Sequence, residues 1–223
     1  MKRYIQKCID SDAELKYYDR ALSLTLSEMG PGGTNFNSPD GLAGIAQGVG
    51  DKQRTGRKIH AKGLRIRGRF ISQIGNVNAR VMVVLDKGCE GAGFNVSNDL
   101  LSGDPSADER NILSFKRLGQ GDNLVVLADK FYHLQLENGG SKGHMEHSMA
   151  PRQECDIYLK LDGEITFRDD GSTQQKNCLF LVVMVDYDGT GGGTNIRAKF
   201  DTRLTSLIVT GKQIGRASCR ERV

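Results

Sequence analysis

The chain has 223 residues, of which 38% are hydrophobic, so it is long enough to form one sizeable core. No apolar run approaches the roughly eighteen residues of a membrane span, and the N-terminus lacks the apolar centre of a signal peptide. We therefore expect neither a transmembrane nor a secreted protein. The five cysteines form no CxxC pair and have no metal-like spacing, which favours free thiols in a reducing compartment.

The first fifty residues are expected to form an N-terminal arm or loop segment. Residues 1–20 have a mixed pattern compatible with a helix, with a small basic start at Lys2, Arg3 and Lys7. Residues 29–50 are rich in Gly, Asn, Ser and Pro, a composition typical of an extended segment without its own core.

Strand patterns dominate from residue 51 to residue 210. Within residues 155–171, Asp162-Gly163 between two alternating segments predicts a hairpin tip, and residues 123–137 have room for one bent strand or two short ones. The almost continuously apolar residues 177–188 indicate a strand buried on both faces. The strand-like segments are residues 59–71, 79–87, 112–119, 123–137, 155–171, 177–188 and 195–210.

About eight strands without a long helical period predict an all-β domain over residues 51–210. The expected fold is a single eight-stranded jelly roll, with two four-stranded antiparallel sheets and the N-terminal arm. An immunoglobulin-like sandwich has the same periodicity, but the chain has no Trp and no Cys…Trp…Cys spacing, which disfavours it.

A basic cluster covers the first of these strands. Leu64, Ile66 and Phe70 share the predicted core face, while arginines alternate with them on the other face. Side chains at period two project about 7 Å apart, close to the spacing of phosphates along a nucleic acid. The cluster, which contains no acid, consists of Lys52, Arg54, Arg57, Lys58, Lys62, Arg65, Arg67 and Arg69.

The cluster has two interpretations, a phosphate-binding strip or a solvated strand face that blunts an edge against aggregation. Solvated faces normally mix both signs of charge, so we favour nucleic-acid binding. Phe70 is the only aromatic close to the cluster in sequence, so we expect phosphate contacts with little base stacking.

The sequence offers little for catalysis or metal binding. His133, His144 and His147 lack the His-x-His spacing of a cupin, and no nucleophile has an obvious activating partner. Asp86, Asp129 and Asp186 follow apolar segments, where Asp ordinarily closes a strand. We therefore expect no enzyme activity, no metal and no cofactor.

The last ten residues, "IGRASCRERV", closely resemble the translation of a common sequencing-adapter oligonucleotide. We expect residues 214–223 to be a tail that is not native. The tail carries a net +2 of the formal +4 of the chain, so the basic cluster is stronger evidence than the overall charge.

Several motifs in order resemble one family. "AELKYYD", "IAQGVGDKQRTGRKIHAKGLRIRG", "ARVMVVLDKGCEGAG", "NDLL" and "FKRLGQGDNLVVLADKFYHL" are similar to the capsid proteins of circular single-stranded-DNA viruses that encode a replication initiator, the circovirus-like group. The resemblance covers roughly residues 13–205. Its most specific part is the block "QGxGDxxRxGRKI", followed by an "LDK" strand end and a later "ADK".

The resemblance implies a virion shell subunit, assembled with itself as about sixty copies (T=1-like) around circular single-stranded DNA, with assembly in the host nucleus. It implies no enzyme activity and no membrane partner. Capsid proteins of this group usually begin with a long Arg-rich arm. Here either such an arm lies upstream or the cluster at residues 52–69 binds the genome alone.

Two alternatives remain. One is a non-assembling nucleic-acid-binding module of the viral movement or shuttle type, which would share the basic strand. The other is a cupin-type enzyme or lectin, which would need a metal at the three histidines.

Overall fold

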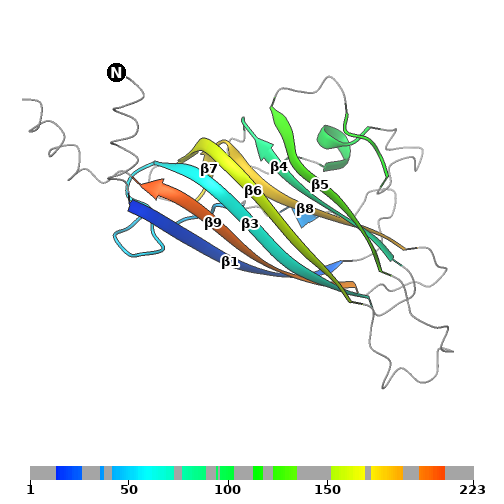
Figure 1. Ribbon diagram of the computed structural model, residues 1–223. Helices are drawn as coiled ribbons and strands as arrows, with labels where there is room; N and C mark the ends of the chain where they lie inside the picture. The colour runs from blue at the N-terminus through cyan, green and yellow to red at the C-terminus, as the bar shows by residue number, and fades with distance from the viewer. Residues whose placement is uncertain are drawn as a thin grey trace, which may run out of the picture.

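The computed structural model describes residues 14–26, 36–37, 42–72, 77–88, 94, 96–102, 113–117, 123–134, 152–168, 172–187 and 196–208. They form two antiparallel sheets packed face to face (Figure 1). The five-stranded sheet has the order β1 (Glu14–Leu26), β9 (Ile196–Ile208), β3 (Lys58–Ser72), β6 (Arg152–Phe167) and β7 (Gln174–Lys176). The four-stranded sheet has the order β2 (Phe36–Asn37), β8 (Cys178–Tyr187), β4 (Val77–Asp86) and β5 (Leu124–Leu134).

The strand order is that of a jelly roll. Apart from the three-residue β7, each sheet has four strands, and the chain crosses between the sheets at every connection except the one from β4 to β5. The first and last strands, β1 and β9, lie side by side, as the Greek-key connections of a jelly roll require. The predicted eight-stranded jelly roll is therefore confirmed, with β7 as a short addition at one edge.

Part of the segment expected to be an arm belongs to this sandwich. β1 pairs with β9 along all thirteen of its residues, so the helical pattern expected for residues 1–20 is wrong from residue 14 onward. Residues 42–50 also contribute to the core through Leu42, Ala43 and Ile45, which are buried. Residues 1–13 of the expected arm and the tail at residues 214–223 lie outside the described residues.

The hairpin predicted at Asp162-Gly163 is wrong, because β6 runs straight through this position. β3 is fifteen residues long and pairs with β6 from Lys58, opposite Thr166, to Ile71, opposite Arg152. The local turn signal is absorbed by a register shift in β3 between Ala61 and Gly63. Long-range pairing therefore overrides a local preference that favoured a turn.

The structure also decides two other strand predictions, those for residues 112–119 and 123–137. Residues 113–117 do not form the edge strand that was expected at residues 112–119. Their β-pairing is limited to an isolated bridge between Lys116 and Leu101. Of the two possibilities for residues 123–137, the structure has a single strand, β5. It contains a register irregularity opposite Val83 and Val84.

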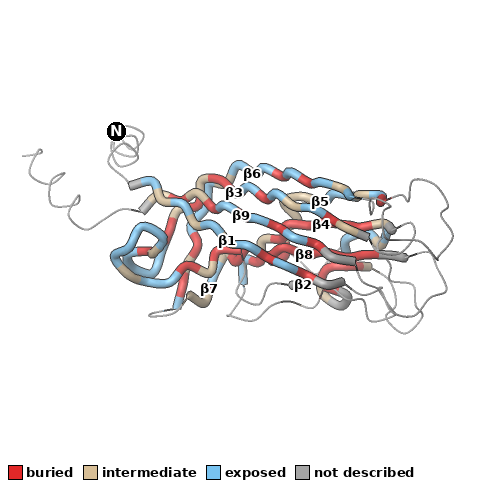
Figure 2. The backbone as a smooth tube through the Cα atoms, turned by 90° about the horizontal axis from the view of Figure 1, so that it is seen from below, coloured by how far each residue is buried: buried red, intermediate tan, exposed pale blue. Residues whose placement is uncertain are grey.

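The main core lies between the two sheets. Within it, Gly68 leaves the space that the ring of Phe200 occupies. Phe70 of β3 packs edge to face on Phe200 of β9, with ring centroids 5.4 Å apart. A Cβ atom at Gly68 would lie 2.2 Å from Cδ1 of Phe200 and 2.9 Å from Sγ of Cys155. Gly68 is therefore required by the ring that packs against it rather than by a turn. Buried and exposed residues alternate along β9, β3 and β6 (Figure 2).

The four-stranded sheet is covered on its other face as well. Met82 and Val84 of β4 and Met184 of β8 pack with Val96 and Leu100 of η1 (Val96–Leu100), a single turn of π-helix. Residues 178–185 are all buried, which confirms that β8 is buried on both faces (Figure 2). Among the described residues, no helix has the length and apolar character that crossing a membrane would need.

The cysteines only partly follow the sequence expectation. Cys155 is a buried free thiol. Cys178 takes part in a disulfide, so the expectation that every thiol is free is wrong there; the partner of Cys178 lies outside the described residues.

Candidate nucleic-acid interface

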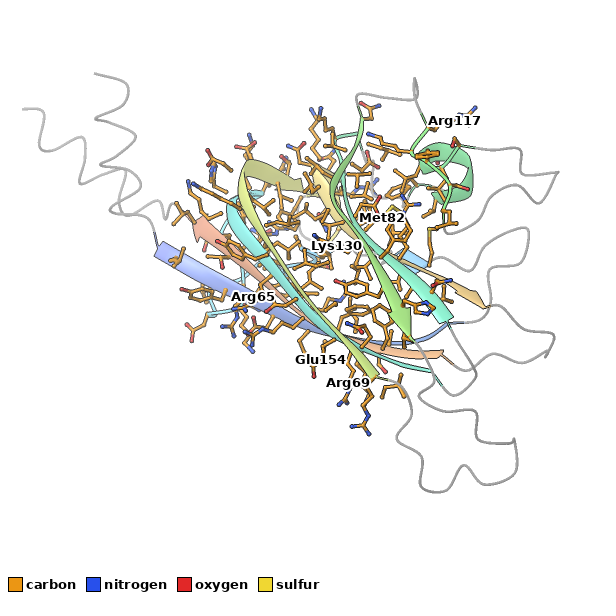
Figure 3. The ribbon with its side chains drawn as sticks, turned by 45° about the vertical axis from the view of Figure 1, so that its right-hand side comes forward. Arg65, Arg69, Met82, Arg117, Lys130 and Glu154 are labelled. Atoms are coloured by element: carbon orange, nitrogen blue, oxygen red, sulfur yellow. The ribbon has the colours of Figure 1, made fainter. Side chains whose placement is uncertain are left out.

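The predicted arginine row lies on the outer face of the five-stranded sheet, which we call the charged face. Arg65, Arg67 and Arg69 are exposed, while Leu64 and Ile66, which alternate with the first two, are fully buried, as the pattern predicts. Figure 3 shows Arg65 and Arg69 along the outside of this sheet, with Glu154 of β6 near Arg69. The position of the row is therefore confirmed as a structural feature.

Neighbouring strands bring acids to the face that the sequence of β3 alone does not contain. The strand registers place the side chains in three rows across β1, β9, β3 and β6. The rows are Asp19, Arg203, Arg65 and Tyr158; then Ala21, Asp201, Arg67 and Asp156; then Ser23, Lys199, Arg69 and Glu154. Five cations thus face four carboxylates, and the anion-free surface expected from the sequence is wrong in three dimensions.

Two of the arginines are bound by carboxylates in the same way. Arg65 donates from Nε to Oδ1 of Asp156 at 3.0 Å and from Nη2 to Oδ2 at 2.6 Å. Arg203 donates from Nε and Nη2 to the two oxygens of Asp19, both at 2.7 Å. The hydrogen bond from Arg65 lowers the pKa of Asp156, and the hydrogen bond from Arg203 lowers that of Asp19. Arg67 lies 3.5 Å from Asp156, so one carboxylate serves both arginines.

The opposite end of β3 is also paired with acids. Lys58 lies 2.7 Å from Glu164, and Lys62 lies 3.3 Å from Asp162. His60 Nε2 lies 2.6 Å from the same oxygen of Asp162, and this hydrogen bond is the main reason that the pKa of Asp162 is lowered. These pairs are exposed and contribute little to stability.

The cations of the charged face that have no ion-pair partner in the described part of the chain lie in the row of Arg69 and Lys199. Among the described residues, the side chains of Arg69 and Lys199 make no ion pair or hydrogen bond, although they lie opposite each other on β3 and β9. Arg152 of β6 is exposed one step further along, opposite Ile71. Two like charges held side by side without a carboxylate between them attract an anion such as a phosphate. This end of the charged face therefore has cations without an ion-pair partner among the described residues, although Glu154 lies opposite Arg69.

Arg54 does not belong to the interface, although the sequence places it in the cluster. Its side chain is fully buried and stacks over the ring of Phe167, with the guanidinium carbon 4.3 Å from the ring centroid. Its guanidinium donates to three backbone carbonyls, those of Ile45 at 3.1 Å, Arg168 at 3.2 Å and Gly56. Arg54 therefore fixes the loop before β3 to the end of the sandwich, and the sequence could not distinguish this use from phosphate binding.

Lys52 and Arg57 occupy the same loop and are exposed. Lys52 lies near Asp19, whose pKa it helps to lower, so it borders the charged face beside β1. The backbone carbonyl of Arg57 accepts a hydrogen bond from the amide of Phe167 at 2.8 Å. This bond fixes the backbone of the loop and does not involve the Arg57 side chain.

Sequence reasoning missed Lys199, Arg203 and Arg152. A signal for the first two was present, because Lys199, Asp201 and Arg203 alternate with Ala198, Phe200 and Leu204 in the same strand pattern as β3. The alternation showed that they face outward. It did not show that β9 lies next to β3, which only the strand order reveals.

The charged face is hollowed rather than flat. One hollow of about 500 Å³ is lined by Arg65, Arg67, Asp201 and Arg203, among others. A second, of about 640 Å³, is lined by the cations Arg67, Arg69 and Lys199 and by the carboxylates Glu154, Asp156 and Asp201, among others. Arg67 and Asp201 border both hollows, so the two lie next to each other along the sheet.

No metal-binding group of three or more His, Cys, Asp or Glu occurs within the part of the chain that the structure describes. His133 Nδ1 lies 2.6 Å from the side-chain oxygen of Asn78. His144 and His147 lie outside the described residues.

Two of the three carboxylates after apolar segments have structural partners, but Asp129 does not close a strand as expected, because it lies within β5. Asp86 accepts a hydrogen bond from the amide of Gly88 at 2.9 Å, which closes β4 as predicted. Asp129 receives a two-point hydrogen bond from Arg80, at 2.8 and 2.6 Å. Burial raises the pKa of the Cys155 thiol to about 11, so it is not a nucleophile at neutral pH. Nothing is described of the Asp186 side chain.

Among known proteins, only solved structures show a similarity to this chain. The chain matches no protein-family model, and no curated protein matches it in sequence. A structure of the Gt strain of infectious bursal disease virus is 11% identical over 90% of this chain and 34% of its own, with a TM-score of 0.32. The VP2 subviral particle of that virus is 9% identical over 89% of this chain and 33% of its own, at 0.33.

Desmodium yellow mottle tymovirus provides a third match, 8% identical over 89% of this chain and 91% of its own, with a TM-score of 0.35. The present chain thus spans about a third of the bursal disease virus chains and most of the tymovirus chain. Since these TM-scores lie below 0.5, the assignment of the fold rests on the strand order described above.

Proposed function

We propose that this chain is a structural subunit of a virus shell that assembles with copies of itself and packages circular single-stranded DNA. In this proposal the shell is small and icosahedral, with about sixty subunits, and forms in the host nucleus. The subunit binds its genome through the charged face and has no enzymatic role.

The agreement between the motif order and the jelly-roll strand order carries the proposal. The block "QGVGDKQRTGRKI" forms the loop that Arg54 anchors and then enters β3, "LDK" ends β4, and "ADK" lies within β5. A jelly roll alone is compatible with shells, lectins and cupins, so the fold does not decide the function. The resemblance in the motifs is what favours the shell.

The charged face supports the second half of the proposal. It offers Arg69 and Lys199, which make no ion pair among the described residues although Glu154 lies opposite Arg69, beside arginines that their carboxylates hold in place. Phosphate contacts of this kind position a nucleic acid without reading its sequence, which suits the packaging of a whole genome.

The test is to express the full chain, image the purified protein by negative-stain electron microscopy and digest it with nucleases. We expect uniform small shells that contain DNA protected from DNase. The same experiment on residues 1–213 shows whether the last ten residues influence assembly.

Protein that binds single-stranded DNA but stays monomeric or dimeric would contradict the shell role and favour the movement- or shuttle-type module. Shells that form without protected DNA would support the structural role and refute packaging. Shells that protect RNA instead would refute the assignment of the genome.

A further inference from the structure

Two exposed tyrosines share the charged face, although they lie far apart in the sequence. Tyr158 of β6 is 68% exposed and Tyr17 of β1 is 47% exposed. Tyr158 lies directly opposite Arg65, and Tyr17 lies next to the row that contains Arg203. Phe70 is the only aromatic residue close to the basic cluster in the sequence, but the strand registers bring these two tyrosines close to it in space.

A glycine gives the Tyr158 ring its position. A Cβ atom at Gly63 would lie 3.3 Å from the Tyr158 hydroxyl oxygen and 3.5 Å from Cε2 of its ring. The ring thus leans over the β3 backbone at the register shift, where another residue would place a side chain. It rests against the sheet and still remains mostly exposed to solvent.

The two arginines between the tyrosines are oriented in advance. The guanidinium carbon of Arg203 lies 5.6 Å from the Tyr17 ring centroid. In both Arg203 and Arg65 the carboxylate is bound through Nε and Nη2, which leaves the two N–H groups of Nη1 for another acceptor. Asp19 and Asp156 therefore lower the net charge but hold each guanidinium in a fixed direction.

Arg203, Arg65 and Tyr158 lie in one row on β9, β3 and β6, and Tyr17 lies on β1 in the neighbouring row, two residues from the Asp19 that faces Arg203. Three strand spacings of about 14 Å and one step of about 7 Å along β1 separate the two tyrosines, a length that a few nucleotides of an extended single strand cover. Aromatic side chains beside phosphate-binding cations form the usual platform for unpaired bases, because every base has a face that can stack. The bases of a duplex are already stacked and cannot use it.

We propose that Tyr17, Arg203, Arg65 and Tyr158 form a track that binds single-stranded nucleic acid, with bases stacked on the two tyrosines and phosphates bound by the two arginines. This inference rests on the proposed function and deepens it, since it makes the charged face selective for single strands. Arg69 and Lys199 supply the neighbouring phosphate contacts.

The test measures binding of the purified full chain to a labelled oligothymidylate of about fifteen nucleotides and to a duplex of the same length. We expect Tyr158→Ala to weaken oligothymidylate binding about 5- to 150-fold and to leave duplex binding nearly unchanged. Tyr17→Ala acts in the same direction, and Tyr158→Phe, which keeps the ring, binds like the unchanged protein. The salt dependence stays the same in all three, because no phosphate contact is lost.

Phe115→Ala is the matched control, because Phe115 is an aromatic residue that is 83% exposed and lies outside the charged face. Thermal unfolding of each variant checks that the sandwich is intact. Oligothymidylate affinity that is unchanged in both tyrosine-to-alanine variants, while Arg69→Ser weakens it, would refute the track and leave the proposed function standing. A wild-type chain that does not bind single strands at all would overturn both the track and the packaging half of the proposed function.

Discussion

Arg65 and Asp156 lie on neighbouring strands and form a two-point ion pair, with Nε to Oδ1 at 3.0 Å and Nη2 to Oδ2 at 2.6 Å. Asp156 also reaches Arg67 at 3.5 Å, so a single residue of β6 neutralises much of the row on β3. The charged face is therefore not uniformly basic. Its cations fall into a set that carboxylates hold in place and a set, Arg69 and Lys199, that makes no ion pair in the described structure.

This division predicts which cations matter most for DNA. Replacing Arg69 and Lys199 together with Ser should reduce the DNA content of the particles more than Arg65→Ser does, since Asp156 already offsets the charge of Arg65. The log–log salt slope of single-strand binding should become shallower by about 1.4, the value for two lost phosphate contacts. Affinities measured over a series of salt concentrations give this slope.

Lys58→Ser with Lys62→Ser is the matched control, because both lysines pair with acids at the other end of β3. The triple change of Arg65, Arg67 and Arg69 to Ser should also lower DNA retention while the sandwich stays folded. Unchanged DNA content in the triple variant would remove the β3 row from the interface.

Asp156→Asn should strengthen single-strand binding, because it frees Arg65 and Arg67 from a competing carboxylate. The gain should be largest at low salt, where phosphate contacts are least screened. Filter-binding titrations at two salt concentrations would show it. An affinity that falls instead would mean that Asp156 serves mainly to orient Arg65, and Asp156→Glu would then restore binding.

The aspartates on this face also predict a dependence of stability on acid. The pKa values of Asp19, Asp156 and Asp162 are all lowered from 3.8 in the folded chain. Their contribution to the free energy of unfolding is therefore complete above the unfolded value and is lost as the pH falls through the folded values. Each contribution is small because the groups are exposed.

We expect Asp162→Asn and Asp156→Asn to flatten the loss of stability between pH 5 and pH 2, measured by urea unfolding across that range. Glu154→Gln is the control, since the Glu154 carboxylate makes no ion pair within the described ranges. An acid limb that is identical in all three variants would show that other carboxylates govern it.

More of the fold than of the candidate site could be predicted from the sequence. Alternation in β3 and the apolar run of β8 directly reflect which faces are buried, so both strands followed from the pattern. The hairpin at Asp162-Gly163 failed because turn chemistry is local, whereas the pairing of β3 with β6 from Lys58 to Ile71 is not. No local signal reports the length of a distant partner strand.

The candidate site depends on neighbours even more strongly. Asp156, Asp19 and Tyr158 come to the charged face from strands that are remote in the sequence, so neither the neutralisation nor the stacking platform could be read from β3. Arg54 is the opposite case. It stands among exposed cations in the sequence, but its side chain enters the protein and binds carbonyls.

Arg54→Met should therefore lower the free energy of unfolding, and it should not remove a contact to nucleic acid. It leaves the carbonyls of Ile45, Gly56 and Arg168 without their donor, at a cost of about 3 kcal/mol in the free energy of unfolding. Urea unfolding measures this loss. The exposed Lys52→Met should change the same quantity by less than about 0.5 kcal/mol. Equal effects of the two changes would contradict the structural role of Arg54.

Gly68→Ala should also destabilise the sandwich, since the added methyl group would lie 2.2 Å from Cδ1 of Phe200. Forcing an extra carbon into a packed core costs about 1 to 3 kcal/mol, which urea unfolding can resolve. Gly163→Ala is the matched control, because nothing lies within 4 Å of the atom that it adds. Phe200→Leu should relieve the clash when combined with Gly68→Ala, so the double variant should lose less stability than the two single changes added together. Strict additivity would show that the Phe200 ring is not what requires glycine at this position.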